Sequence, residues 1–408
     1  MKTVMFYCQH VLGMGHLVRS MQIVRALKGY YRVHFVNGGE SIRGVDVPEG
    51  VRVINLSPLR SDAHFKTIES SAGIMDLEQV KTARRQQLLS EFERIQPDIL
   101  MIELFPFGRK KFAFELVSLL DRIRSDGLST RVVCSLRDIL VEKSDQARYE
   151  QRVCELMNRY FDLLLVHADP DFQRLDETFF RVADIQAPIR YTGYVGPSSE
   201  TDVGSDDVAI PQTSAEPLIV ASVGGGRVGH ELLECTLRAS VALKARCPHR
   251  LTLFAGPYMP EPEYASLKDL VEGESHIELQ RYTNRFLSYL KGARLSVSQA
   301  GYNTCMDIIA TGVRSLVLPF TGGENQEQTI RAHKLEQRGV VTVIRPDDLA
   351  PERFANIIAR AMTATHRTRR GVVDVNGAQN SASALRDLLN ATVTGGSLAN
   401  IRRPVPQH

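Results

Sequence analysis

Apolar runs alternate with helical stretches along the first 195 residues of the chain. The runs TVMFYC, PDILMIEL and DLLLVHAD are almost continuously apolar, as is typical of strands that are buried on both faces. Residues 77–95 and 112–125 lie between such runs and have apolar positions at helical spacing. Strands that alternate with helices form parallel sheets, and right-handed crossovers cover both faces of the sheet. The pattern predicts a doubly wound α/β domain over residues 1–195.

A polar segment at 196–216 interrupts this alternation. Its sequence, GPSSETDVGSDDVAIPQTSAE, is rich in Gly, Pro, Ser and Asp, which predicts a linker. The pattern restarts with PLIVASVGGG and indicates a second Rossmann-like domain over 217–365. Residues 366–408 hold a polar end and one more helical stretch, which could pack back on the first domain. A length of 408 residues also favours two domains, and we expect both sets of strand ends to face a shared cleft.

A glycine turn separates the first predicted strand from the first helix, in HVLGMGHLVRS. Its residues Gly13, Met14 and Gly15 lead into a helix N-terminus, which offers unpaired N–H groups and partial positive charge to an anion. Val18 stands where the dinucleotide-binding fingerprint has its third glycine, so the turn gives little support to a nicotinamide cofactor. His16 begins the helix, where its imidazole could act as a general base or merely cap the turn.

Three consecutive glycines, Gly224, Gly225 and Gly226, precede the first predicted helix of the second domain. Such a run costs backbone entropy, so it serves either to bring N–H groups against a phosphate or as a loose surface turn. Arg227 follows the run, and its charge favours the first interpretation. No GK[ST] sequence follows, which excludes a P-loop.

A third turn lies in VSQAGYNTCMDIIATGVRSLVLPF, residues 297–320, which reads as a strand, a polar turn with one glycine, a helix and a strand. The segment from QRYTNRFL to KLEQRG resembles the donor-binding half of GT-B glycosyltransferases. It is most similar to the family that includes the peptidoglycan transferase adding N-acetylglucosamine to lipid-linked muramyl-pentapeptide. The shared features are Gly301, an acidic residue six positions later (Asp307), Pro319 and the ENQEQ segment. The N-terminal GMGH also resembles a loop of that family.

The resemblance implies a role for each matched residue. Asp307 would accept hydrogen bonds from the ribose hydroxyls of the donor, because a carboxylate can accept two at once. Tyr282 and Thr283 would hold the uracil, and His16 would be the catalytic base. The first glycine loop would lie near the diphosphate or the acceptor. The residues expected beside the donor diphosphate are Ser298, Gln299, Ala300, Gly301, Asn303 and Thr304, and those expected near the sugar are Glu324, Asn325, Gln326 and Gln328.

The activity implied by the resemblance is that of an inverting, metal-independent glycosyltransferase. It would move a sugar from a nucleoside diphosphate, UDP by resemblance, to a hydroxyl acceptor without a cofactor. Fixed N–H donors would stabilise the leaving diphosphate, and no suitably placed DxD motif is present for a metal. The acceptor of the peptidoglycan enzyme is not implied, because the first half does not match it. Alternatives are a nucleotide-sugar hydrolase or 2-epimerase, a non-catalytic sugar-nucleotide-binding protein and, least supported, a nicotinamide-dependent oxidoreductase.

Charged residues that follow predicted strands of the first domain could line an acceptor pocket. These residues are Glu103, Arg109, Arg137 and Asp138. The RKK run at 109–111 would suit an acidic or phosphorylated acceptor, although such a run is more often a solvated helix start. Arg84 and Arg85 are expected on an exposed helix face.

The composition limits the partners and the compartment. A net charge of +3 without a long basic run gives no indication of nucleic-acid binding. Six cysteines without CxxC spacing argue against a zinc site or disulfides and for a reduced, cytoplasmic setting. No run approaches the roughly 18 apolar residues of a membrane span, and the first apolar run is too short for a signal peptide. Any membrane contact is therefore expected to be peripheral, and the oligomeric state is not indicated.

Overall fold

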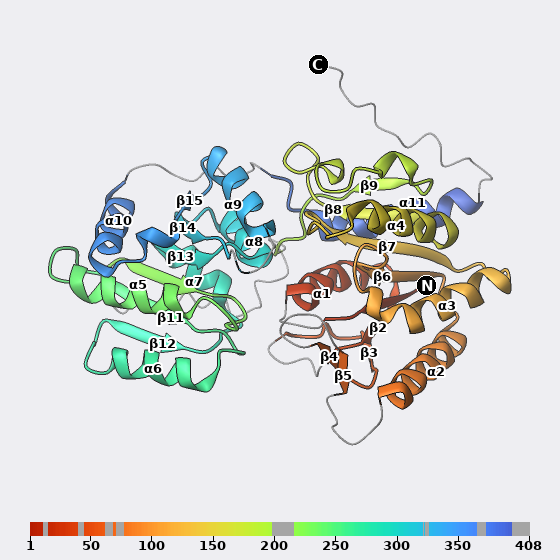
Figure 1. Cartoon of the computed structure of the whole chain (residues 1–408), viewed down its shortest axis with the longest axis horizontal. Coiled ribbons are helices and arrows are strands. Elements are labelled where there is room, and N and C mark those ends of the chain that lie inside the picture. Colours follow the sequence, from red (N-terminus) through yellow and green to blue (C-terminus); the bar gives the residue numbers. More distant parts are fainter. Residues whose placement is uncertain are drawn as a thin grey trace, which may run out of the picture.

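Two parallel sheets, each covered by helices, lie side by side in the computed structural model (Figure 1). The structure describes residues 1–10, 15–39, 45–61, 68–70, 77–197, 216–320, 322, 326–364 and 373–393. The predicted linker therefore lies mostly outside the described residues. The predicted fold class is confirmed, because both sheets are parallel throughout and lie within separate halves of the chain.

The first sheet has seven strands in the order β3-β2-β1-β6-β7-β8-β9. The fully buried strands β6 and β8 correspond to the apolar runs PDILMIEL and DLLLVHAD. The strands are β1 (Thr3–Cys8), β2 (Arg32–Asn37), β3 (Arg52–Asn55), β6 (Ile99–Glu103), β7 (Arg131–Arg137), β8 (Leu163–His167) and β9 (Ile189–Tyr191). The helices beside them are α1 (Gly15–Leu27), α2 (Leu77–Ile95), α3 (Ala113–Ser125) and α4 (Gln146–Tyr160). An antiparallel hairpin of β4 (Leu59–Ser61) and β5 (Ile68–Ser70) was not predicted.

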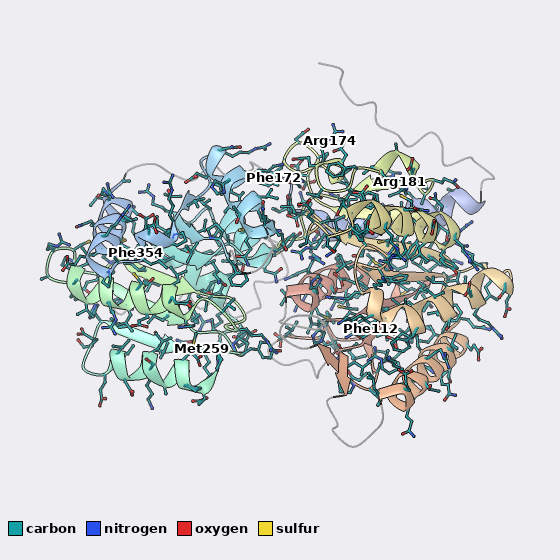
Figure 2. All side chains as sticks on the ribbon, in the orientation of Figure 1. Phe112, Phe172, Arg174, Arg181, Met259 and Phe354 are labelled. Atoms are coloured by element: carbon teal, nitrogen blue, oxygen red, sulfur yellow. The ribbon has the colours of Figure 1, made fainter. Side chains whose placement is uncertain are left out.

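The second sheet has six strands in the order β12-β11-β10-β13-β14-β15. Its strands are β10 (Leu218–Ser222), β11 (Arg250–Phe254), β12 (Ile277–Gln280), β13 (Leu295–Gln299), β14 (Ser315–Leu318) and β15 (Thr342–Val343). Its helices are α5 (His230–Leu243), α6 (Glu261–Val271), α7 (Phe286–Gly292), α8 (Tyr302–Thr311), α9 (Glu327–Gln337) and α10 (Pro351–Thr363). Apolar side chains fill both domains, with Phe112 in the first and Phe354 in the second (Figure 2).

The last helix, α11 (Gly377–Val393), returns to the first domain after the second sheet is complete (Figure 1). Its residues Ala382, Leu385 and Leu388 share one buried cluster with Leu17 and Met21 of α1. The chain therefore crosses between the domains twice, which ties the second domain to the first at both of its ends. None of the helices in the described ranges is long and apolar enough to span a bilayer.

Each sheet has one point at which the strand order reverses. In the first sheet this point lies between β1 and β6, and in the second between β10 and β13. In open α/β sheets, the turns that leave the two central strands diverge to opposite faces at such a point, at the carboxyl ends of the strands. Ligands of these sheets bind in the crevice between such turns. All three glycine turns singled out in the sequence leave a strand at one of these two points.

Arg84 is buried, so the expectation of an exposed face is wrong for this residue. Helical spacing places it on the same side of α2 as the buried Val80 and Leu88, four residues away in each direction. Its guanidinium donates to both carboxylate oxygens of Glu115, at 2.9 and 2.6 Å. It also donates to the backbone oxygens of Gly38 and Ser57 and to Gln9 Oε1. These contacts compensate for removing the charge from water.

Arg84→Ala should lower the free energy of unfolding by about 3–5 kcal/mol, because it removes the positive charge that balances the buried Glu115 carboxylate. Arg85→Ala is the matched control, since Arg85 is the next residue and is exposed. It should change the stability by less than about 0.5 kcal/mol. Urea denaturation followed by circular dichroism suits a chain without tryptophan. Equal effects of the two substitutions would contradict the burial of Arg84.

Candidate active site

His16 and Glu103 meet at the reversal point of the first sheet. His16 is the second residue of α1, which follows β1, and Glu103 is the last residue of the neighbouring strand β6. The parallel pairing of β1 with β6 brings the two strand ends to the same edge of the sheet. His16 Nδ1 lies 2.6 Å from Glu103 Oε1. Glu103, expected to face an acceptor, is therefore the carboxylate partner of His16.

The protonation of this pair follows from its surroundings. Burial lowers the pKa of His16 to about 3, although the Glu103 carboxylate acts in the opposite direction. Burial opposes the ionisation of Glu103, yet the neighbouring His16, Arg19 and Arg109 lower its pKa to about 2. At neutral pH the imidazole is therefore uncharged and the carboxylate is ionised. An ionised carboxylate only accepts hydrogen bonds, so the proton is on Nδ1 and Nε2 keeps a free lone pair.

Arg19 supplies the positive charge that balances Glu103. It lies one turn after His16 on α1, and its Nη2 donates to Glu103 Oε1 at 2.5 Å. Both side chains are almost fully buried, with exposed fractions of 2% and 0%. The ion pair keeps Glu103 in place as an acceptor for the imidazole. Arg19 was not predicted from the sequence, in which its position three residues after His16 is the signal that points to it.

The N-terminus of α8 lies directly against the start of α1. Asn303 Nδ2 donates to the backbone oxygen of Gly15 at 3.3 Å, across the two domains. Gly301 is the N-cap residue of α8 and is half-buried, as are Asn303 and Asp307. The turn expected to hold the donor diphosphate therefore adjoins the helix start that carries His16.

Tyr302 connects α8 to the first domain. Its hydroxyl oxygen accepts a hydrogen bond from the backbone N–H of Val195 at 2.9 Å. The guanidinium carbons of Arg19 and Arg331 each lie 5.3 Å from the centre of its ring, at a distance typical of cation–π contacts. The ring of Tyr194 is 5.8 Å away. The first residue of α8 is therefore fixed by groups of both domains.

A buried ion pair joins the domains beside Tyr302. Arg331 of α9 donates from Nε and Nη2 to the two carboxylate oxygens of Asp138, both at 2.9 Å. Arg331 also pairs with Glu327 at 2.6 Å, and Glu327 in turn pairs with Arg137. Asp138 and Arg137 were candidates for acceptor binding, and the structure engages both in contacts between the domains. Glu327 and Arg331, spaced as a helical i,i+4 pair, were missed.

The second glycine turn, at Gly224–Gly226, lies very close to the backbone that follows β11. Gly224 and Gly226 have φ values of 63° and 85°, which other residues rarely adopt. A Cβ atom at Gly226 would lie 2.2 Å from the oxygen of Ala255. Gly229 ends the turn, and a Cβ there would lie 2.7 Å from Gln299 Nε2. The turns after β10 and β13 therefore meet at the reversal point of the second sheet.

Several residues of the predicted donor site make structural contacts. Ser298 is fully buried and its hydroxyl bonds to that of Ser296 at 2.9 Å. Ala300 is also fully buried, and Thr304 is 8% exposed. Gln328 Oε1 accepts from the backbone N–H of Phe320 at 3.0 Å, which fixes the end of β14. These side chains shape the turns, so contacts to a donor would come from backbone groups and half-buried neighbours.

The other predicted donor residues are more open. Arg227 lies over the ring of Tyr258 at 5.2 Å. Tyr282 is exposed, and partial burial raises its pKa, with Asp46 acting in the same direction and Arg25 against it. Thr283 Oγ1 accepts from the backbone N–H of Arg285 at 3.1 Å. Gln326 is the exposed N-cap residue of α9. Gly13, Met14, Glu324 and Asn325 lie outside the described residues.

Comparison with known proteins agrees with this arrangement. Residues 220–382 match the model of the glycosyltransferase family 28 C-terminal domain. The match covers most of the second domain and extends into the first turns of α11. A relative from Brucella canis, UDP-N-acetylglucosamine--N-acetylmuramyl-(pentapeptide) pyrophosphoryl-undecaprenol N-acetylglucosamine transferase, is 22% identical over 182 residues. That match covers 44% of this chain and 48% of the relative, so it extends over only about half of either protein.

Solved structures show the fold of the whole chain. The calicheamicin glycosyltransferase CalG4 is 16% identical, with a TM-score of 0.56 over 97% of this chain and 95% of CalG4. The UDP-GlcNAc 2-epimerase from Methanocaldococcus jannaschii is 10% identical, with a TM-score of 0.59 over 95% of this chain and 100% of the epimerase. The expected GT-B architecture is confirmed, and so is the resemblance to the N-acetylglucosamine transferase family.

Asp138→Ala should lower the free energy of unfolding by about 3–5 kcal/mol, because it removes the carboxylate that binds two nitrogens of the buried Arg331 and leaves only Glu327 to balance this charge. Adding Arg331→Met should restore part of this loss, since the buried charge is then removed. Asp126→Ala is the control, because Asp126 forms an exposed pair with Arg122, and it should cost less than about 1 kcal/mol. Urea denaturation measures all three. Equal decreases in the free energy of unfolding for Asp138→Ala and Asp126→Ala would contradict a buried ion pair between the domains.

Proposed function

We propose that the protein transfers a sugar from a nucleoside-diphosphate sugar to an acceptor hydroxyl. The observation that carries this proposal is the contact between Asn303 and Gly15, which places the His16–Glu103 pair beside the turn at Gly301. A base and a diphosphate-binding turn at adjoining helix starts are the two parts that glycosyl transfer requires. The family 28 domain and the N-acetylglucosamine transferase relative support a UDP-linked sugar as the donor.

His16 would accept the proton of the attacking hydroxyl on Nε2. As the imidazole becomes positively charged, the carboxylate of Glu103 stabilises it at 2.6 Å. Glu103 itself keeps its negative charge, since Arg19 pairs with it. The bond from the acceptor oxygen to the anomeric carbon forms as the bond to the diphosphate breaks. A single displacement of this kind inverts the anomeric centre, so we propose an inverting transferase.

The leaving diphosphate gains negative charge in the transition state. Unpaired N–H groups at the N-terminus of α8, which begins at Tyr302, carry partial positive charge toward it. The close turn at Gly224–Gly226 lies at the same reversal point. The N–H groups of Gly224 and Gly226 donate to Ser222 Oγ and to the oxygen of Val223, so the N–H of Gly225 would be the added donor. Asp307, in the second turn of α8, would accept from the ribose hydroxyls. Because these fixed dipoles supply the stabilisation, we propose that the reaction is independent of metal.

We also propose a cytoplasmic location. All six cysteines are free thiols in the structure, which suits a reducing compartment. A sugar nucleotide and a hydroxyl compound are the partners that the proposed reaction requires.

A second candidate is a nucleotide-sugar 2-epimerase or hydrolase. The likeness to the UDP-GlcNAc 2-epimerase favours it at the level of fold. Incubation of the protein with a donor sugar alone separates the candidates. Rapid epimerisation or hydrolysis would support the second candidate, and a stable donor that turns over only with an acceptor would support the transferase. A donor that binds but never turns over would indicate a non-catalytic binding protein.

His16→Ala should lower kcat by about 10²- to 10⁴-fold, because the proton acceptor is lost. Glu103→Gln should lower kcat less, since a glutamine oxygen can still accept the Nδ1 proton but cannot neutralise the imidazolium. His333→Ala is the control, because His333 is exposed on α9. The measurement is the initial rate of UDP release with donor and acceptor present. An unchanged rate for His16→Ala would exclude this histidine as the base.

The same assay should show no loss of rate between pH 8 and pH 5 that arises from His16. The base acts in its neutral form, and burial lowers the pKa of His16 to about 3, so the imidazole stays neutral over this range. A solvated histidine would instead become protonated near its ordinary pKa of about 6.5. A drop in kcat/KM centred near pH 6.5 that disappears in His16→Ala would contradict this assignment.

Asp307→Ala should abolish most of the stabilisation that UDP gives to the folded protein. A ligand at 100 times its Kd stabilises the native state by about 2.7 kcal/mol, so a thermal-shift assay detects the loss. Asp269→Ala is the matched control, because Asp269 is an exposed carboxylate of the same domain on α6. UDP binding by Asp307→Ala at the parent affinity would contradict the ribose assignment.

A further inference from the structure

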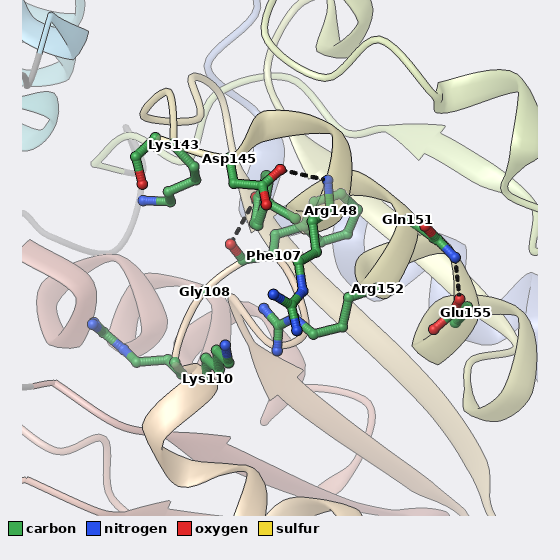
Figure 3. Close-up of a pocket in the computed structure, with 12 residues that line it drawn as sticks. Phe107, Gly108, Lys110, Lys143, Asp145, Arg148, Gln151, Arg152 and Glu155 are labelled. Carbon is green, nitrogen blue, oxygen red and sulfur yellow. Dashed lines mark hydrogen bonds between the residues drawn. The ribbon is translucent and has the colours of Figure 1, made fainter.

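A basic groove opens on the first domain next to the strand that carries Glu103. It has a volume of about 760 Å³ and lies between the loop after β6 and the N-terminal half of α4 (Figure 3). Five cationic side chains line it: Arg109, Lys110, Lys143, Arg148 and Arg152. Arg148 and Arg152 point from α4 toward the loop with Gly108 and Lys110 (Figure 3).

The five cations share the groove without a carboxylate bound to them in the described ranges. Within the described part of the chain, none of the five forms an ion pair. Other arginines of the first domain are paired, for example Arg159 of the same helix with Asp121 at 3.0 Å. Like charges in one groove repel one another, so the arrangement costs energy that an anion would offset.

The acidic residues of the groove are used elsewhere. Asp145 is the N-cap of α4 and its carboxylate accepts from the backbone N–H of Arg148 at 3.1 Å. Glu155 accepts from Gln151 Nε2 at 2.9 Å. Two acidic against five basic residues leave a net positive lining. A narrow groove of one charge sign concentrates the field and attracts anions.

The loop that joins the groove to the catalytic pair is held in place. It runs from Glu103 to Arg109, and the N–H of Gly108 donates to the oxygen of Leu104 at 2.9 Å. The hydroxyl of Tyr149 on α4 donates to the oxygen of Phe107 at 2.8 Å. Arg109 has a φ of 57°, a conformation that costs energy for a residue other than glycine. Its guanidinium lowers the pKa of both His16 and Glu103, after larger contributions from burial and from the pair itself.

We propose that this groove binds a phosphate group of the acceptor and thereby directs the acceptor hydroxyl to His16. This role for the groove rests on the proposed glycosyl transfer, because only a transferase has an acceptor for the groove to bind. The guanidinium of an arginine can bind a phosphate through two parallel N–H donors, and Lys110 and Lys143 add positive charge. The phosphate could belong to a lipid headgroup or to a soluble phosphate ester, which present the same chemistry to these side chains.

Inorganic pyrophosphate is a probe for the groove. Its binding to the whole protein is measured by isothermal titration calorimetry with UDP at saturation, so that the donor site is filled. The double variant Arg148→Gln/Arg152→Gln should bind pyrophosphate at least tenfold more weakly than the parent. Arg159→Gln is the matched control on the same helix and should bind like the parent. Lys110→Gln, at an exposed position, should weaken binding without risk to folding.

The outcomes separate this inference from the proposed function. No binding of pyrophosphate by the parent, or equal binding by the parent, the double variant and Lys110→Gln, overturns the groove assignment. If pyrophosphate binding depends on the groove residues but UDP does not stabilise the protein, the phosphate site is supported and the proposed donor is contradicted.

The source of the phosphate is tested with vesicles. Phosphatidylcholine vesicles with phosphatidic acid should sediment the parent protein but not the double variant if the phosphate is a lipid headgroup. Binding of free pyrophosphate without sedimentation assigns a soluble phosphate ester. Sedimentation that is equal for both proteins shows contact with the vesicle outside the groove, and the calorimetric result then decides the assignment.

Discussion

The buried ion pair between Arg331 and Asp138 is the contact on which the proposed site depends. It connects α9 of the second domain to the end of β7 in the first, and both side chains are fully buried. Breaking such a pair leaves one charge in a medium that solvates it poorly, so the two domains are strongly held in this relative position. The ring of Tyr302, the first residue of α8, lies against Arg331, so this contact holds the start of α8 beside the ion pair. The ion pair therefore fixes the position of the turn at Gly301, the proposed donor-binding turn, relative to His16.

Strand order then explains why the chemistry lies where it does. Each sheet reverses its order once, and the turns that leave the central strands part at that point. His16 and Glu103 belong to the first reversal, and the turns at Gly226 and Gly301 belong to the second. The contact from Asn303 to Gly15 joins the two points. The proposed proton acceptor of one domain and the proposed anion-binding turns of the other therefore adjoin, and neither domain alone supplies both.

The sequence predicted the elements better than the contacts between them. Apolar runs such as PDILMIEL indicated buried strands because a strand covered on both faces has no polar side. The resemblance around Gly301 and Asp307 predicted a glycosyltransferase domain in the second half of the chain, and the family 28 match over residues 220–382 supports that prediction. Arg84 was misplaced because its charge was given more weight than its helical phase, which aligns it with Val80 and Leu88. Asp138 and Arg331 are 193 residues apart in the sequence. Their ion pair depends on how the two domains pack together, which no local sequence pattern encodes. The pairing of Glu103 with His16 likewise depends on which strands are neighbours.

The central claim is that a donor diphosphate lies between the start of α8 and His16. A crystal structure of the protein with bound UDP tests this most directly. The account predicts the β-phosphate within hydrogen-bonding distance of backbone N–H groups in the first turn of α8, the ribose on Asp307, and His16 Nε2 facing the space beside the phosphate. UDP bound away from α8, or at α8 with His16 turned away from the phosphate, would contradict it.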